Sequence, residues 1–126
     1  MTVTQWTLYT LAFIALIAFM VMRRSGQISK REAADYLRQG ACIVDVRTPR
    51  EFSSGHLLQA LNFPLDELEG LVPERIKDKN RVILVHCRTG LRSKKAKERL
   101  ESIGYKHVFD LGSYERAFKI VSGRML

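Results

Sequence analysis

The sequence predicts an α/β fold built on a mostly parallel sheet and preceded by one membrane-spanning helix. Short apolar runs at residues 42–46, 82–86 and 107–111 have the length and composition of buried strands. Longer stretches with helix-start and helix-stop signals alternate with these runs, and such alternation is typical of parallel sheets covered by helices. Ahead of them, residues 6–22 carry no charged side chain.

The uncharged N-terminal segment is the first element. Together with residues 3–5 it reaches the roughly 20 residues that cross a bilayer, and Trp6 and Tyr9 suit one membrane interface. A cleaved signal peptide is the alternative, but it needs positive charge before the apolar run, and residues 1–5 have no charged side chain. We therefore expect residues 1–24 to form an anchor that contacts lipid through residues 3–24.

Basic residues after the span predict its orientation. They are Arg23, Arg24, Lys30 and Arg31. Under the positive-inside rule they indicate a single-pass protein of the cell membrane whose C-terminal domain lies in the cytoplasm. A reducing compartment also suits a free thiol.

The first half of the domain shows clear helix signals. We expect residues 25–28 to be a linker and residues 29–126 to be the domain. Ser29 and Glu32 have the spacing of a capping box, and this first helix ends at Gly40. After the strand at residues 42–46, Thr48 is a helix cap with Pro49 at the first helical position.

The second half continues the alternation of strands and helices. Its expected elements are a short extended segment at 60–64, one or two helices within 65–76, a strand at 82–86, a helix at 93–103, a strand at 107–111 and a helix at 113–121. Gly70 and Pro73 are expected to break the helical stretch that contains them, and Gly104 to end the next helix.

The loop after the strand at residues 82–86 carries most of the chemistry. Residues 86–93 read His-Cys-Arg-Thr-Gly-Leu-Arg-Ser. A loop between the carboxyl end of a strand and a helix can turn its N–H groups inward beside the positive end of the helix dipole, which forms an anion cradle. Arg88 and Arg92 favour the thiolate form of Cys87 there. A thiolate inside an anion cradle is a nucleophile beside its substrate site, so the sequence predicts an enzyme.

Other candidate residues have structural interpretations. Cys42 lies in a predicted buried strand, so we favour a packing role over that of a resolving thiol. His86 is expected to pack beneath the loop, with an influence on the Cys87 thiol as the alternative. No His or Cys cluster has the spacing of metal ligands, so neither a metal nor a cofactor is expected. The net charge of +8 is spread along the chain without interleaved aromatic residues, which argues against nucleic acid as a partner.

Three stretches of the chain resemble the single-domain rhodaneses, which are sulfurtransferases that carry sulfur as a cysteine persulfide. The first is Ile-Val-Asp-Val-Arg-Thr-Pro-Arg-Glu-Phe at residues 43–52 with Gly55-His56; the others are residues 87–93 and 104–112. The resemblance covers about residues 28–120. It implies a five-stranded, parallel-type sheet flanked by helices, and thiosulfate or a persulfide as the sulfur donor.

The resemblance also implies roles for individual residues. Cys87 is the nucleophile and persulfide carrier, and Asp45 and Arg47 match a mainly architectural pair. The substrate-binding residues are those that follow the nucleophile: Arg88, Thr89, Gly90, Leu91 and Arg92. Sulfur then passes to a thiophilic acceptor such as a thiol or a protein thiol.

The chain departs from the family pattern around the site. Leu57-Leu58-Gln59-Ala60 stands where the family has an Ile-Pro-Gly-Ala turn. Gly112-Ser113 replaces a Gly-Gly turn, and Phe118 replaces a tryptophan. These departures leave the nucleophile intact and concern the acceptor that the rim of the pocket admits.

Two alternative functions remain at this point. Cysteine phosphatases and arsenate reductases also use a cysteine in an anion cradle, but the phosphatase loop is one residue longer than the four residues between Cys87 and Arg92. The smaller ring of N–H donors here seats a tetrahedral phosphate poorly. The second alternative is an inactive rhodanese-like module that acts as a membrane-tethered binding or regulatory domain. The presence of Cys87, Gly90 and Arg92 favours activity over this alternative.

Overall fold

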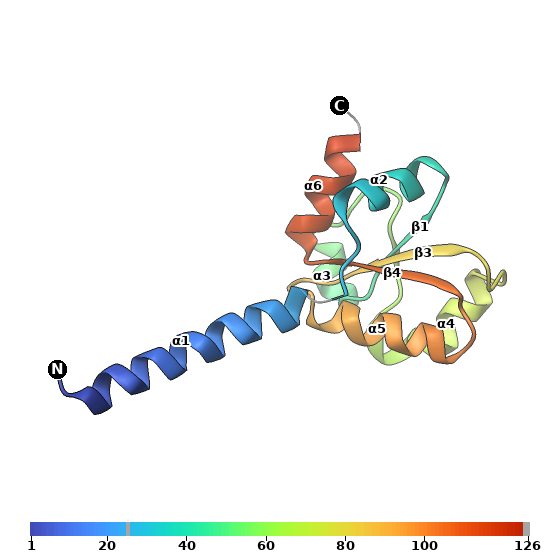
Figure 1. Ribbon diagram of the computed structural model, residues 1–126. Helices are drawn as coiled ribbons and strands as arrows, with labels where there is room; N and C mark the ends of the chain where they lie inside the picture. The colour runs from blue at the N-terminus through green and yellow to red at the C-terminus, as the bar shows by residue number, and fades with distance from the viewer. Residues whose placement is uncertain (25, 125–126) are drawn as a thin grey trace.

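A parallel sheet of four strands with helices on both faces forms the domain (Figure 1). The computed structural model describes residues 1–24 and 26–124. In chain order the elements are α1 (Val3–Arg24), α2 (Lys30–Arg38), β1 (Cys42–Asp45), α3 (Pro49–Ser53), β2 (Leu61–Asn62), the 3₁₀ helix η1 (Leu65–Glu67), α4 (Leu68–Arg75), β3 (Val82–His86), α5 (Leu91–Ser102), β4 (His107–Gly112) and α6 (Tyr114–Arg124). The predicted α/β class is confirmed.

The register of the strands brings three strand ends together. The strands are ordered β2-β1-β3-β4, and all pairs are parallel. Asp45 at the end of β1 pairs with His86 at the end of β3, and His86 pairs with Gly112 at the end of β4. The residues that follow these ends therefore share one edge of the sheet, where ligands of open parallel sheets bind.

Alternation along the strands builds two cores. Ile83 and Val85 of β3 point to one face, where they pack with buried residues of α4 and α5 such as Val72 and Leu100. Leu84 points to the other face and packs among buried residues of α2 and α6. The period of two residues per strand thus produces one helix layer on each side (Figure 1).

The sheet is one strand smaller than the resemblance implies. Beside β4 there is only an isolated parallel bridge, between Gln27 and Asp110, and the Ile28 N–H donates to the Asp110 carbonyl at 2.9 Å. The expectation of five strands is therefore wrong for the described residues. Gln27 and Ile28 are attached to the domain, so half of the expected linker at residues 25–28 belongs to it; residue 25 lies outside the described part of the chain.

The helices of the middle segment also differ from expectation. The break falls between η1 and α4, and α4 continues through Gly70 and Pro73. Gly70 is exposed with nothing near the position of a Cβ, and Pro73 removes a single helical hydrogen bond, the one to the carbonyl of the exposed residue Glu69. α5 begins at Leu91, two residues before the expected start, directly after Gly90, whose φ of +100° ends the loop and which has no side chain to cap the helix.

α1 stands apart from the domain (Figure 1). Its segment Val3–Met22 has 20 residues of mean hydropathy 1.8 and is long and apolar enough to cross a membrane, as are many N-terminal signal sequences. The described side chains of α1 are exposed, and neither core includes any of them. Because both cores lie within residues 28–121, we expect a fragment of residues 26–126 to fold without α1.

Candidate active site

Cys87 lies at the edge of the sheet where the strand ends meet. It directly follows β3, its side chain is completely buried, and its N–H donates to the Gly112 carbonyl at 3.1 Å. Two further links hold the loop in place: a bridge between Thr89 and Ser113, and a hydrogen bond of 3.2 Å from the Tyr114 N–H to the Arg88 carbonyl. The turn between β4 and α6 thus supports the loop that carries the cysteine.

Backbone and hydroxyl groups surround the Cys87 sulfur. The Gly90 N–H donates to Sγ at 2.9 Å, and the Ser93 hydroxyl oxygen lies 3.6 Å from Sγ. Ser93 also donates to the Gly90 carbonyl at 3.1 Å, which ties the helix start to the loop. Gly90 adopts φ +100°, a left-handed conformation that residues with a Cβ rarely adopt, and this turn aims its N–H at the sulfur.

The N-terminus of α5 lacks the caps found on other helices of the domain. Ser29 caps α2 and Thr48 caps α3 through their side chains, and each of these helices has an acidic residue in its first turn. α5 has neither a side-chain cap nor a first-turn acid. The positive end of its dipole is therefore uncompensated beside Cys87, which favours an anion at the sulfur.

Arg92 is paired with a residue from the other half of the domain. Its Nη1 and Nη2 donate to Glu51 Oε1 and Oε2 at 2.6 and 2.9 Å. The Arg92 hydrogen bonds lower the pKa of Glu51 from 4.5 to about 2, and the same pair raises the pKa of Arg92. Glu51 also accepts from the Thr48 N–H at 3.2 Å in a complete capping box, so one carboxylate holds both α3 and the loop arginine.

The other predicted substrate-binding residues differ in exposure. The side chains of Arg88, Thr89 and Leu91 are exposed around the loop, whereas Gly90 is buried with the sulfur. The structure therefore brings all five residues that follow Cys87 to one end of the domain. It places Gly90 against the sulfur and the exposed three on the rim.

A buried charged pair lies beneath the loop. Arg47 donates from Nε and Nη2 to Asp45 at 2.9 and 2.7 Å, and its Nη2 also reaches the Gly55 carbonyl at 2.8 Å. Asp45 is completely buried, and hydrogen bonding to it raises the pKa of Arg47. The Arg47 guanidinium also stacks 4.7 Å from the ring centre of Tyr114. The pair connects the end of β1 with Gly55 after α3 and with Tyr114 at the start of α6, which agrees with the architectural role that the resemblance implies.

His86 is buried under the same loop. Its Nδ1 lies 3.3 Å from the Cys87 carbonyl, and its Nε2 lies 3.7 Å from Asp45 Oδ2, too far for a hydrogen bond. Burial lowers the pKa of His86, so the ring is neutral at pH 7. The expectation that His86 packs beneath the loop is confirmed.

Cys42 lies at the opposite edge of the sheet. It pairs with Ile83 at the start of β3, while Cys87 follows the end of that strand. Ile83 and Cys87 are four residues apart, and at about 3.3 Å per residue this separates Cys42 from Cys87 by roughly 13 Å along the strand direction, more than a disulfide spans. Burial raises the pKa of the Cys42 thiol. Both observations support packing rather than a resolving role.

Sequence reasoning missed two residues of the site. Glu51 lies within a quoted motif, but its partner Arg92 is 41 positions away, and no local pattern connects them. Ser93 ends the loop sequence at residues 86–93, but no role at the sulfur was predicted for it; its place six residues after Cys87 is the available signal. Within the described residues, no group of three or more His, Cys, Asp or Glu side chains is arranged to hold a metal ion.

Comparisons with known proteins agree with this geometry. The profile of the rhodanese-like domain matches residues 29–117. The thiosulfate sulfurtransferase PspE of Escherichia coli is 38% identical over 69 residues, 55% of this chain and 66% of that protein. The uncharacterized protein YqhL of Bacillus subtilis is 33% identical over 104 residues, 79% of this chain and 81% of that protein.

Two solved structures have a similar fold. A rhodanese with anions from E. coli has a TM-score of 0.59 and 34% identity, covering 61% of this chain and 91% of its own. The human single-domain sulfurtransferase TSTD1 has a TM-score of 0.64 and 25% identity, covering 75% of this chain and 96% of its own.

Proposed function

We infer, since this chain belongs to the rhodanese-like domain family, that it is a sulfurtransferase that carries sulfane sulfur on Cys87. The observation that carries the proposal is the environment of the Cys87 sulfur, which receives the Gly90 N–H at 2.9 Å beside the uncapped N-terminus of α5. Such a site stabilises an anionic sulfur without a charged side chain in contact.

The proposed reaction has two steps. The Cys87 thiolate attacks the outer sulfur of thiosulfate, the S–S bond of the donor breaks, and the bonding electron pair leaves with sulfite. A Cys87 persulfide anion remains. In the second step an acceptor thiolate attacks the outer sulfur, the new S–S bond of Cys87 breaks, and the Cys87 thiolate is restored.

The loop residues have distinct proposed roles in this reaction. The backbone N–H groups from Gly90 onward hold the outer sulfur in the persulfide state, and the exposed guanidinium of Arg88 attracts the anionic donor. Arg92 shares its charge with Glu51, so we assign it a smaller part in donor binding than Arg88. Thr89 and Leu91 shape the entrance.

Intact mass spectrometry of residues 26–126 tests the proposal. Incubation with thiosulfate is expected to add the mass of one sulfur atom to the wild-type fragment and to the Cys42→Ala variant, but not to Cys87→Ala. Steady-state kinetics with varied donor and acceptor should give parallel double-reciprocal plots. No mass gain with thiosulfate or with any persulfide donor would reject the sulfurtransferase and leave the inactive module as the function to test.

We also propose that α1 anchors this domain to the cell membrane with the domain in the cytoplasm. The support is the length and apolarity of Val3–Met22, and the basic residues that follow it in the sequence. The structure does not describe the side chains of Arg23 and Arg24, so the support from these two residues comes from the sequence. Carbonate extraction of membranes should leave the full chain in the pellet. In intact cells, an exposed cysteine introduced in the domain should react with a membrane-impermeant thiol reagent only after the membrane is permeabilised.

A further inference from the structure

The chain joins the domain very close to the end of the apolar helix. α1 ends at Arg24, and Gln27 already forms its bridge with Asp110 of β4. Three residue steps of at most about 3.5 Å each allow roughly 10 Å between these two points. Whatever angle α1 takes, the attachment point on the sheet stays within this distance of the end of the helix.

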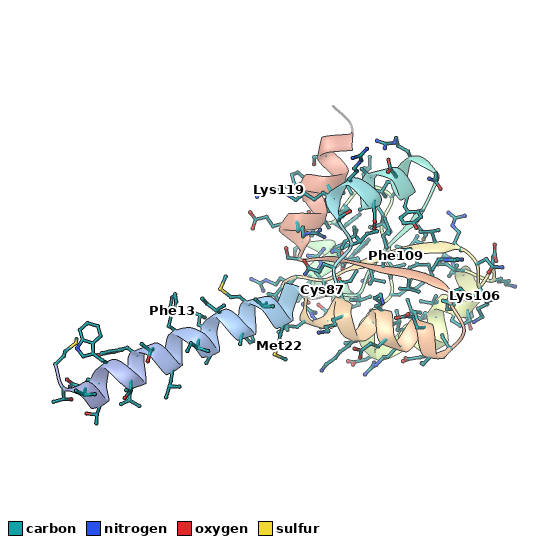
Figure 2. All side chains as sticks on the ribbon, in the orientation of Figure 1. Phe13, Met22, Cys87, Lys106, Phe109 and Lys119 are labelled. Atoms are coloured by element: carbon teal, nitrogen blue, oxygen red, sulfur yellow. The ribbon has the colours of Figure 1, made fainter. Side chains whose placement is uncertain are left out.

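The attachment point belongs to the edge of the sheet that carries Cys87. Asp110 precedes Gly112 by two residues, and the Gly112 carbonyl accepts the Cys87 N–H. The amide of Gln27 lies against the loop itself, since a Cβ added to Gly90 would meet Gln27 Nε2 at 3.3 Å. Figure 2 shows Cys87 and Met22 at the same end of the domain and Lys106 at the opposite end.

A second contact connects α1 with the start of α5. Lys94 Nζ donates to the Met22 carbonyl at 3.4 Å, and Lys94 lies in the first turn after the Cys87 loop. The loop is therefore the part of the domain nearest to the end of the apolar helix. If α1 is embedded in a bilayer, this edge faces the headgroups.

The side chains at this edge suit a membrane surface. Beyond α1, three large apolar side chains are exposed in the described part of the chain: Leu58, Leu91 and Phe118. Leu91 is 49% exposed at the first position of α5. Phe118 is 52% exposed and stacks 6.3 Å from the ring centre of Tyr114, whose N–H donates to the Arg88 carbonyl. Leu91 thus follows the Cys87 loop directly, and Phe118 is connected to that loop through Tyr114.

Positive charge accompanies these apolar side chains. Arg88 in the loop is exposed, and Lys94 is half-buried with its ammonium group at the end of α1. Cationic side chains near an anionic membrane surface are attracted to it. Apolar residues interleaved with basic ones are the composition of surfaces that rest in the headgroup layer.

We propose that the loop rim, defined as Arg88, Leu91, Lys94 and Phe118, rests on the anionic lipid headgroups of the membrane that holds α1. The entrance to Cys87 then opens onto the membrane surface, and sulfur enters and leaves the site there. The proposal rests on the proposed anchoring of α1. It also extends the proposed sulfur transfer, because the donor and the acceptor would reach Cys87 along the membrane surface.

Tryptophan quenching in vesicles tests the position of the rim. Trp6 is the one tryptophan of the chain, so it reports the insertion of α1 in the wild-type protein. Full-length Trp6→Phe protein carrying Phe118→Trp or Leu91→Trp reports the rim, and Trp6→Phe with Lys106→Trp is the matched control at the far end. Each is reconstituted into phosphatidylcholine and phosphatidylglycerol vesicles that contain a lipid with a nitroxide on its headgroup.

The expected result is strong quenching of Trp6 and of the tryptophans at 91 and 118, several-fold greater than at 106. Quenching of Trp6 with equal, weak quenching at 91, 118 and 106 would overturn the proposal while the anchor stands. An unquenched Trp6 would overturn the anchor and this inference together. The mass gain of Cys87 with thiosulfate, measured on the same samples, reports the sulfurtransferase function separately from both outcomes.

Discussion

The Glu51–Arg92 pair allows a prediction with a magnitude. Replacing Glu51 with Gln removes the charge that receives both guanidinium nitrogens of Arg92, at 2.6 and 2.9 Å, and keeps the size of the side chain. The pKa of Glu51 falls from 4.5 to about 2, chiefly because of the hydrogen bonds from Arg92, and this fall corresponds to roughly 3 kcal/mol between the two protonation states.

Solvent reduces this value. The side chains of Glu51 and Arg92 are 24% and 32% exposed, so part of the attraction is screened. We expect the pair to contribute about 1–2 kcal/mol to the free energy of unfolding. Because the folded-state pKa of Glu51 lies below its unfolded value, the contribution is complete above pH 4.5 and is lost as the pH falls toward about 2.

A double-mutant cycle in urea measures this contribution. The cycle combines Glu51→Gln and Arg92→Gln in residues 26–126, with unfolding followed at pH 7 and near pH 3. The exposed pair Glu115–Lys119, whose side chains are 79% and 64% exposed, is the matched control and should couple by about 0.3 kcal/mol. The reasoning is refuted if the Glu51–Arg92 coupling is no larger than that of the control, or if it is the same at both pH values.

Two other substitutions test the frame of the site. Asp45→Asn leaves the buried Arg47 charge without its carboxylate and should lower the free energy of unfolding by about 3 kcal/mol, measured by urea unfolding; a loss below that of an average surface mutation would contradict the pairing. Gly112→Ala places a Cβ 2.6 Å from Gln27 Nε2 at φ +88°, whereas Gly40→Ala has φ +90° and nothing within 4 Å. Both substitutions should lower the free energy of unfolding by about 1–2 kcal/mol, because the alanine takes a left-handed conformation. Only Gly112→Ala should also slow the gain of sulfur mass at Cys87, because the carbonyl of residue 112 accepts the Cys87 N–H.

Local signals in the sequence were sufficient for most of the fold. Thr48 and Pro49 begin α3 where the capping pattern predicts, because a cap depends only on residues within one turn. Strand β3 and the position of Cys87 after it follow from one apolar run and the residues that end it. These features are encoded within about ten consecutive residues.

The remaining features depend on contacts between distant segments. The absence of a fifth strand in the described residues depends on the contact between Gln27 and Asp110, which are far apart in the sequence and form only an isolated bridge. Local signals predict a break at Gly70 and Pro73, whereas α4 continues through both, with Leu68 and Val72 packed in the core. The Glu51–Arg92 pair likewise needs α3 and α5 to be placed next to each other.

The distribution of charge suits the proposed role of this site, which is to hold sulfur and then release it. Arg92 is compensated by Glu51, Arg47 by Asp45, and burial keeps His86 neutral. The donor in contact with the Cys87 sulfur is instead the Gly90 N–H, next to the N-terminus of α5, which has no side-chain cap, whereas the Ser93 hydroxyl donates to the Gly90 carbonyl. Dipoles of this kind stabilise one anionic sulfur but attract a divalent anion less than paired arginines would. A carrier needs that balance, since its persulfide must form readily and then be given up to the acceptor.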